Sequence, residues 1–177
     1  SLELIKVNFF SIPADFNNET PKKLRKLNEK YKNACIDETY GHITVGNLWG
    51  SGRANDLLPR VDMKILREYI TVLKENGIHF NYILNASCMN NMEFYPNGLQ
   101  KIIHFLDELD NMCVDCVTVA IPFFIELIKA KKYKFKIKVS TVSLVNNAEK
   151  ALYYKSMGVD RLVVDESINR DFDKLKQ

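Results

Sequence analysis

Polar side chains that could perform acid–base chemistry follow the short apolar runs of this sequence. Carboxylates can serve as general acids or bases, whereas amides and arginines can hold a carbonyl or an anionic group. The candidates are three carboxylates, three amides, two arginines and one thiol: Asn47, Arg53, Asn85, Cys88, Glu93, Asp165, Glu166, Asn169 and Arg170. We expect Glu93, Asp165 and Glu166 to be catalytic and the others to bind substrate. Exposed loops are polar without further reason, so a solvated surface is the alternative.

The segment GNLWGSGR carries three glycines, Gly46, Gly50 and Gly52, before Arg53. Glycines let a backbone approach an anionic group, and Arg53 could supply the opposite charge. The spacing matches neither the P-loop nor the dinucleotide-binding fingerprint. A flexible turn is therefore the simpler interpretation.

Cys88 is the cysteine best placed for chemistry, because it comes soon after the third apolar run. A thiolate nucleophile needs a base or a positive field that lowers its pKa. His42 and His79 stand at the beginnings of two expected strands, away from Cys88, and His104 falls in an expected helix. This topology argues against a Cys–His dyad and favours a structural cysteine.

Two further patterns have plain structural interpretations. Cys113 and Cys116 form a C-x-x-C, but it falls at a helix-to-strand return, whereas thioredoxin-like motifs precede a helix. The lysine-rich stretch KAKKYKFKIK, residues 129–138, could bind RNA or DNA. A solvated helix end followed by a strand explains the same lysines better, because cations suit the end of a helix dipole.

Short apolar runs alternate along the chain with segments of helical spacing. The runs predict buried strands over residues 2–10, 42–48, 80–84, 114–121, 136–142 and 161–164. Between the runs, Leu66, Ile70 and Leu73 recur at intervals of three and four residues. The alternation of strand and helix predicts an α/β protein with a parallel sheet.

The expected helix boundaries support this organisation. Asp62 is an N-cap candidate, Pro96 begins a helix, and Gly77 and Gly158 end helices. Helix-to-strand returns are tight, so the longer polar connections put the candidate site at the carboxyl ends of the strands. We predict a single α/β domain over residues 1–177, an incomplete TIM-like (β/α) barrel of about six parallel βα units that forms the N-terminal part of a longer barrel. An open doubly wound sheet is the alternative.

The composition is that of a globular protein, with 46% hydrophobic residues, 27% charged residues and a net charge of +3. No apolar run reaches the roughly 18 to 20 residues that span a bilayer, and we find no secretion signal. Four cysteines without an export signal predict reduced thiols. We therefore expect a cytoplasmic protein with no membrane association.

Three segments together resemble the collagenase-like peptidase family of unassigned catalytic type, peptidase family U 32. They are FNYILNASCMNNMEF after the third run, KVSTVS after the fifth and GVDRLVVDESINRDF after the sixth. The resemblance extends from about residue 40 to the end and implies the N-terminal portion of that family's barrel. On the strand-3 loop of the family it places Asn85, Cys88, Asn90 and Glu93. On the strand-6 loop it places Asp165, Glu166, Asn169 and Arg170.

The resemblance implies a peptidase-like hydrolase that acts at the polar carboxyl ends of the strands. Some relatives resemble RNA- or quinone-hydroxylation enzymes whose later segment holds an iron–sulfur cluster on four cysteines. We therefore expect no cofactor in this chain, and a cluster only where a C-terminal segment exists. Part of such a hydroxylation enzyme and a non-catalytic peptide- or RNA-binding module are the alternatives. The expected partners are a peptide or RNA substrate, a second copy of the chain, or a missing C-terminal segment.

Overall fold

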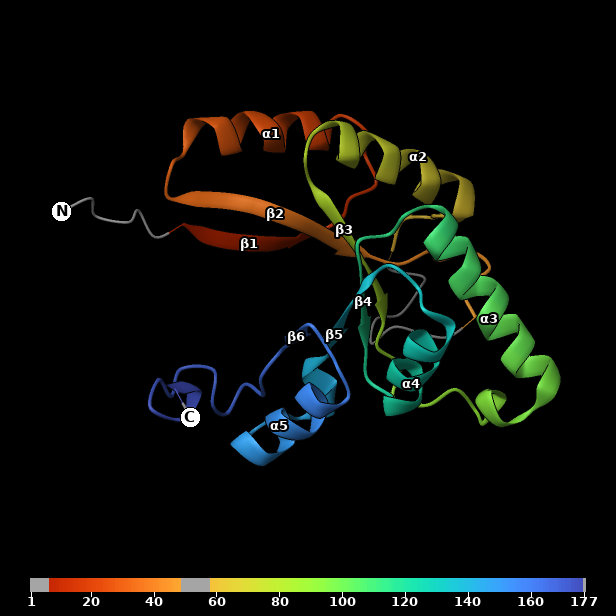
Figure 1. Cartoon of the computed structure of the whole chain (residues 1–177). Helices are drawn as coiled ribbons and strands as arrows, with labels where there is room; N and C mark the ends of the chain where they lie inside the picture. Colours follow the sequence, from red (N-terminus) through yellow and green to blue (C-terminus); the bar gives the residue numbers. More distant parts are fainter. Residues whose placement is uncertain (1–6, 49–57, 177) are drawn as a thin grey trace. The chain divides into compact units, whose positions relative to one another are not determined.

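Parallel strands and helices alternate in the computed structural model, which describes residues 7–48 and 58–176 (Figure 1). The strands are β1 (Asn8–Pro13), β2 (Ala34–Gly41), β3 (His79–Leu84), β4 (Cys116–Val119), β5 (Lys136–Val139) and β6 (Arg161–Leu162). The helices are α1 (Thr20–Lys30), α2 (Met63–Glu75), α3 (Pro96–Asn111), α4 (Pro122–Lys131) and α5 (Ala148–Ser156), with 3₁₀ turns η2 (Met92–Phe94), η3 (Thr141–Ser143) and η4 (Lys174–Lys176).

The strand order of the sheet follows the chain, from β1 to β6. The pairs β1–β2, β2–β3, β4–β5 and β5–β6 are all parallel. A doubly wound sheet reverses its strand order at a switch point, and this order does not reverse. The predicted barrel-type βα repeat is therefore confirmed, and the open doubly wound alternative is wrong.

Contacts divide the described residues into two units. The first comprises residues 7–47 and 58–82, and the second comprises residue 48 and residues 83–176. The prediction of a single domain that belongs to a longer barrel stays a prediction.

The first unit packs α2 against its strands through an apolar helix face. Leu66, Ile70 and Leu73, the residues that recur at helical intervals, are all buried. Tyr69, on the same helix, contacts Phe80 of β3 with ring centroids 6.3 Å apart. Figure 1 shows α1 and α2 on the same side of β1 and β2. This arrangement leaves the other face of the strands free of helices from this unit.

The predicted boundaries of helix α2 are confirmed. The Asp62 carboxylate accepts a hydrogen bond from the Ile65 amide at 2.9 Å, so Asp62 is the N-cap. Gly77 follows the C-cap with a φ of 70°. Glycine adopts this left-handed conformation without steric cost, which ends the helix and lets the buried Ile78, the next residue, lead into β3.

The second unit is a series of tight βα repeats. All four residues of β4 are buried, and β5 alternates between more exposed and buried residues. Pro96 and Pro122 begin α3 and α4 at a position where the missing proline N–H costs no helix hydrogen bond. After α5, Gly158 has a φ of 78°, as its predicted place at the helix end requires.

The second strand lies earlier in the chain than predicted. β2 spans Ala34–Gly41, and the predicted residues 42–48 form no strand. The apolar Ile43 in this run is buried, and its amide donates to the Tyr82 hydroxyl at 3.2 Å. The polar Glu38 concealed the true strand, because buried parallel strands are ordinarily continuous apolar runs.

The first strand also differs from the prediction, since β1 covers Asn8–Pro13 rather than residues 2–10. Residues 1–6 lie outside the described part of the chain. The last three strands are in place but shorter than predicted. After β4 the predicted end residues lead into α4, and after β5 they lead into η3. After β6 the chain forms only an isolated bridge, between Val164 and Val145.

Among the described residues, no helix combines the length and apolar character that crossing a bilayer requires.

Candidate functional site

The connection between β3 and α3 holds two unsatisfied acceptors. Oδ1 of Asn85 and Oε2 of Glu93 are buried atoms, and neither has a hydrogen-bond partner among the described residues. A buried polar atom without a partner costs free energy, so native structures rarely retain one without a reason. Both side chains were predicted site residues, and both can accept a hydrogen bond from a ligand.

Two asparagines shape this connection. Asn90 and Asn91 have φ angles of 52° and 61°. Asparagine tolerates this left-handed region better than most residues, because its short side chain can hydrogen-bond locally. The turn they make leads directly into η2, whose second residue is Glu93.

Gly98 allows η2 to pack closely on the first turn of α3. A Cβ atom at Gly98 would overlap the backbone oxygen of Met92 and lie 2.9 Å from its carbonyl carbon. Only glycine avoids this overlap, so the position of Glu93 depends on a glycine five residues further along the chain.

Cys88 is exposed on the same connection. Its sulfur accepts a hydrogen bond from the Asn90 amide at 3.3 Å, which stabilises the turn. The neighbouring Met89 is buried and anchors this part of the loop. This local bond agrees with the structural role expected for the thiol.

The loop after β6 carries the other two predicted carboxylates. Asp165 accepts a hydrogen bond from the Ser167 amide at 2.9 Å. Hydrogen bonds from the side chain and backbone of Ser167 lower the pKa of Asp165, so this carboxylate stays charged and suits a turn better than proton transfer near neutral pH. Glu166, Asn169 and Arg170 are exposed.

Asn47 is tied to the sheet by the buried hydroxyl of Tyr82. The hydroxyl donates to Oδ1 of Asn47 at 3.2 Å and accepts from the Ile43 amide at 3.2 Å. Burial raises the pKa of Tyr82 well above its ordinary value, so the hydroxyl remains a donor. The predicted anion-binding residue Arg53 lies outside the described residues.

A buried polar cluster that the sequence analysis missed crosses three strands of the first unit. Oε1 of Glu38 accepts from Oγ of Ser11 at 2.7 Å and from Nδ2 of Asn81 at 3.2 Å. Glu38 and Asn81 are each 2% exposed. The misplaced second strand concealed this cluster, and an acidic residue within a β-branched and aromatic run was the signal for it.

His42 follows the carboxyl end of β2, whereas the sequence analysis placed it at the beginning of a strand. Its ring is buried, and Nδ1 lies 2.8 Å from the carbonyl oxygen of Ile43. The placements of His79 at the start of β3 and His104 within α3 are confirmed. The position of His42 therefore does not count against a Cys–His dyad.

The cysteines do not form a ligand set for an iron–sulfur cluster. Cys35 lies on β2, Cys88 on the loop after β3, Cys113 after α3 and Cys116 on β4, and none of the four forms a disulfide. Within the described ranges, no three histidine, cysteine, aspartate or glutamate side chains gather as metal ligands. The chain's own cysteines therefore do not fit such a cluster.

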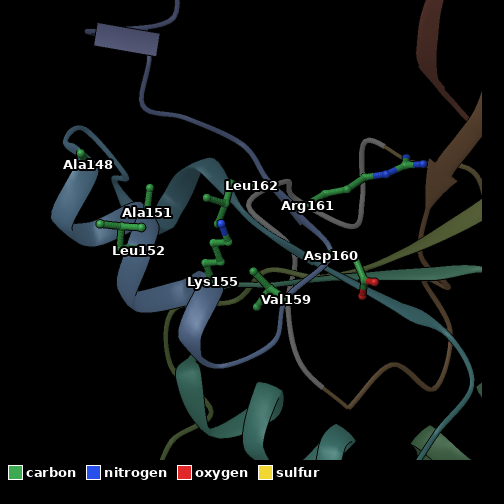
Figure 2. Close-up of a pocket in the computed structure, with 8 residues that line it drawn as sticks. All are labelled: Ala148, Ala151, Leu152, Lys155, Val159, Asp160, Arg161 and Leu162. Atoms are coloured by element: carbon green, nitrogen blue, oxygen red, sulfur yellow. The ribbon is translucent and has the colours of Figure 1, made fainter. Parts of the chain in front are cut away.

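A cavity of about 400 Å³ lies in the second unit, beside α5 (Figure 2). Its walls come from α5, β6 and the turn between them, including Leu152, Val159 and Leu162, with Lys155 and Asp160 also among the lining residues. None of the predicted site residues in the described part of the chain is among its lining residues.

The side-chain hydrogen bonds described for the predicted site residues go to Tyr82, Asn90 and Ser167, and none joins two candidates. The structure thus places the predicted site residues in separate local environments. Of the three predicted carboxylates, Glu93 has a buried oxygen without a hydrogen-bond partner among the described residues, whereas Glu166 is exposed.

Solved structures share the fold of this chain. The U32 peptidase Mk0906 matches 99% of this chain and 65% of its own, with a TM-score of 0.73 and 18% identity. D-psicose 3-epimerase matches 94% of this chain and 68% of its own, with a TM-score of 0.52 and 12% identity. Phospho-2-dehydro-3-deoxyheptonate aldolase of Thermotoga maritima matches 91% of this chain and 42% of its own, with a TM-score of 0.50 and 12% identity. With the unreversed strand order, these likenesses define a partial TIM-like barrel.

Sequence comparison identifies the family. The family model of Peptidase family U32 matches residues 51–171. The chain is also 32% identical over 176 residues to the uncharacterized protease MJ1657 of Methanocaldococcus jannaschii. That alignment covers 95% of this chain and 51% of the relative, so the chain spans about half the length of that curated protein. The chain belongs to peptidase family U32.

Proposed function

We propose that this chain is a peptide-hydrolase domain that binds its substrate on the connection between β3 and α3. The observation that supports the proposal is the pair of buried acceptors, Oδ1 of Asn85 and Oε2 of Glu93, without partners among the described residues. The family membership and the protease relative support peptide hydrolysis as the reaction class.

A peptide substrate supplies the groups that these acceptors need. Each backbone amide carries an N–H donor, and a free amino terminus carries a cationic one. A hydrogen bond from such a donor to Glu93 is charge-assisted and therefore stronger than a bond between neutral groups. Asn85 would accept a hydrogen bond from a second donor.

The test compares three glutamates with different surroundings. Glu93→Gln keeps the size of the side chain but removes the charge, so we expect kcat/KM for a peptide substrate to fall about ten- to hundredfold, corresponding to a charged hydrogen bond of about 1.5–3 kcal/mol. Glu149→Gln changes an exposed residue in the first turn of α5 and should leave kcat/KM unchanged.

Glu166→Gln separates this proposal from the sequence-based one. If Glu166 is the general base, its replacement should abolish turnover while Glu93→Gln has little effect. That result would contradict the proposed role of Glu93. Circular dichroism of each variant checks that the fold is retained.

The four cysteines, none of which forms a disulfide, support a cytoplasmic location, which we include in the proposal. Reducing compartments keep cysteines unpaired, whereas secreted domains use them for disulfides.

A further inference from the structure

Ser11 and Glu38 form a short side-chain hydrogen bond on neighbouring strands of the first unit. Oγ of Ser11 lies 2.7 Å from Oε1 of Glu38, and Ser11 donates. Ser11 is exposed, whereas Glu38 is almost fully buried. The pair therefore joins an exposed serine to a carboxylate residue that is almost fully buried, through a part-buried hydrogen bond.

An irregularity in the sheet creates this pairing. Phe10 lies opposite Ile36, but the next residue, Ser11, lies opposite Glu38, so that Asp37 is the extra residue of β2. Without the shift Ser11 would lie opposite Asp37 rather than Glu38. Such bulges commonly redirect side chains beside active sites.

Asn81 completes the arrangement from β3. Its Nδ2 donates to the same Oε1 of Glu38 at 3.2 Å. A nucleophile, a base within hydrogen-bond reach and a third group that orients the base are the recurring parts of a covalent catalytic site. The three side chains come from three successive parallel strands, which hold them more rigidly than loops would.

We propose that Ser11 is a nucleophile for acyl transfer, that Glu38 is its general base and that Asn81 positions Glu38. This inference rests on the proposed peptide-hydrolase function and names the residues that would perform its bond cleavage.

The reaction balances with water as the only co-reactant. Oγ of Ser11 forms a bond to the peptide carbonyl carbon while its proton moves to Glu38. The C–N bond then breaks as this proton passes to the leaving amine, which gives an ester on Ser11. Glu38 takes a proton from the attacking water, and the ester breaks as that proton returns to Oγ.

The test uses diisopropyl fluorophosphate, which forms an Oγ–P bond with an activated serine and releases fluoride. The intact mass of the 177-residue chain should show one adduct, and peptide mapping should place it on Ser11. Ser11→Ala should abolish labelling. Glu38→Gln, which retains an acceptor for Ser11 and Asn81, should slow labelling at least about 100-fold, the usual contribution of a general base.

Ser156→Ala is the matched control, because Ser156 is an exposed serine whose hydroxyl donates to the Tyr153 carbonyl oxygen rather than to a carboxylate. It should label as fast as the wild type. Equal labelling rates for Glu38→Gln and the wild type would overturn the assignment of the base.

Asn81→Ala tests the positioning role. The maximal labelling rate should fall about tenfold, while the reagent concentration that gives half of this rate stays unchanged. A purely structural role would instead leave the labelling rate of the folded variant unchanged, and that result would overturn the role of Asn81.

The outcomes also separate this inference from the proposed function. A wild-type chain that hydrolyses peptides without labelling at Ser11, and whose Ser11→Ala variant keeps its turnover, overturns the nucleophile and leaves the hydrolase proposal standing. Labelling at Ser11 that depends on Glu38, without peptide hydrolysis, supports the nucleophile and contradicts the peptide substrate.

Discussion

At the residue scale, the hydroxyl of Tyr82 connects the sheet of the first unit to the segment that follows β2. It accepts from the Ile43 amide and donates to Asn47, each at 3.2 Å. Tyr82 and Ile43 are both almost completely buried, so water cannot replace either partner. This one oxygen atom therefore keeps a buried backbone donor satisfied.

Tyr82→Phe should lower the free energy of unfolding by about 1–3 kcal/mol, because the Ile43 amide would lose its acceptor in a buried position. Urea denaturation monitored by circular dichroism measures the change. Tyr133→Phe is the control, since its hydroxyl donates to the exposed Asp107 carboxylate, which water can solvate. Equal effects of the two substitutions would show that the Tyr82 hydrogen bonds are not the cause.

At the element scale, the packing of η2 on α3 sets the position of Glu93. Gly98 allows this contact, because any Cβ there meets the backbone of Met92. Helix propensity alone would favour alanine over glycine by about 1 kcal/mol. The overlap opposes this gain, and it involves backbone atoms that cannot move by a simple rotation.

Gly98→Ala should therefore destabilise the chain by about 1–3 kcal/mol, as overpacking usually does, and should reduce kcat/KM by displacing Glu93. Asn97→Ala, at the exposed preceding position of the same turn, should change stability by less than about 0.5 kcal/mol. Thermal unfolding of both variants measures these changes in stability. If Gly98→Ala proves more stable than the wild type, the close approach of η2 does not hold Glu93.

The elements could be predicted where the sequence carried local signals. The N-cap Asp62, the helix start at Pro96 and the turn at Gly77 follow from local chemistry, and all were predicted. β2 was missed because its central residues are polar, and the donors Ser11 and Asn81 that bind Glu38 lie on other strands. No single segment reveals such a tertiary contact.

The candidate site could also be predicted only in part. Asn85 and Glu93 were identified from their place after an apolar run, although only the structure shows that their acceptor atoms are buried. The binding of Asp165 to Ser167 was not foreseen, because a turn residue and a catalytic carboxylate have the same appearance in a sequence.

At the scale of the whole molecule, the chain is a partial TIM-like barrel of the U32 family that spans about half of its curated relative. TIM barrels place their chemistry at the carboxyl ends of the strands. Asn85 and Glu93 follow β3 in this way, whereas Ser11, Glu38 and Asn81 lie within the strands.

The most direct measurement of the central claim is peptide-bond cleavage by the 177-residue chain. The folded chain would be incubated with a mixture of unstructured peptides, and mass spectrometry would identify new amino termini. We expect the wild type to create them and Glu93→Gln to create them about ten- to hundredfold more slowly. A folded wild-type chain that creates no new amino termini would contradict the claim that it is a peptide hydrolase.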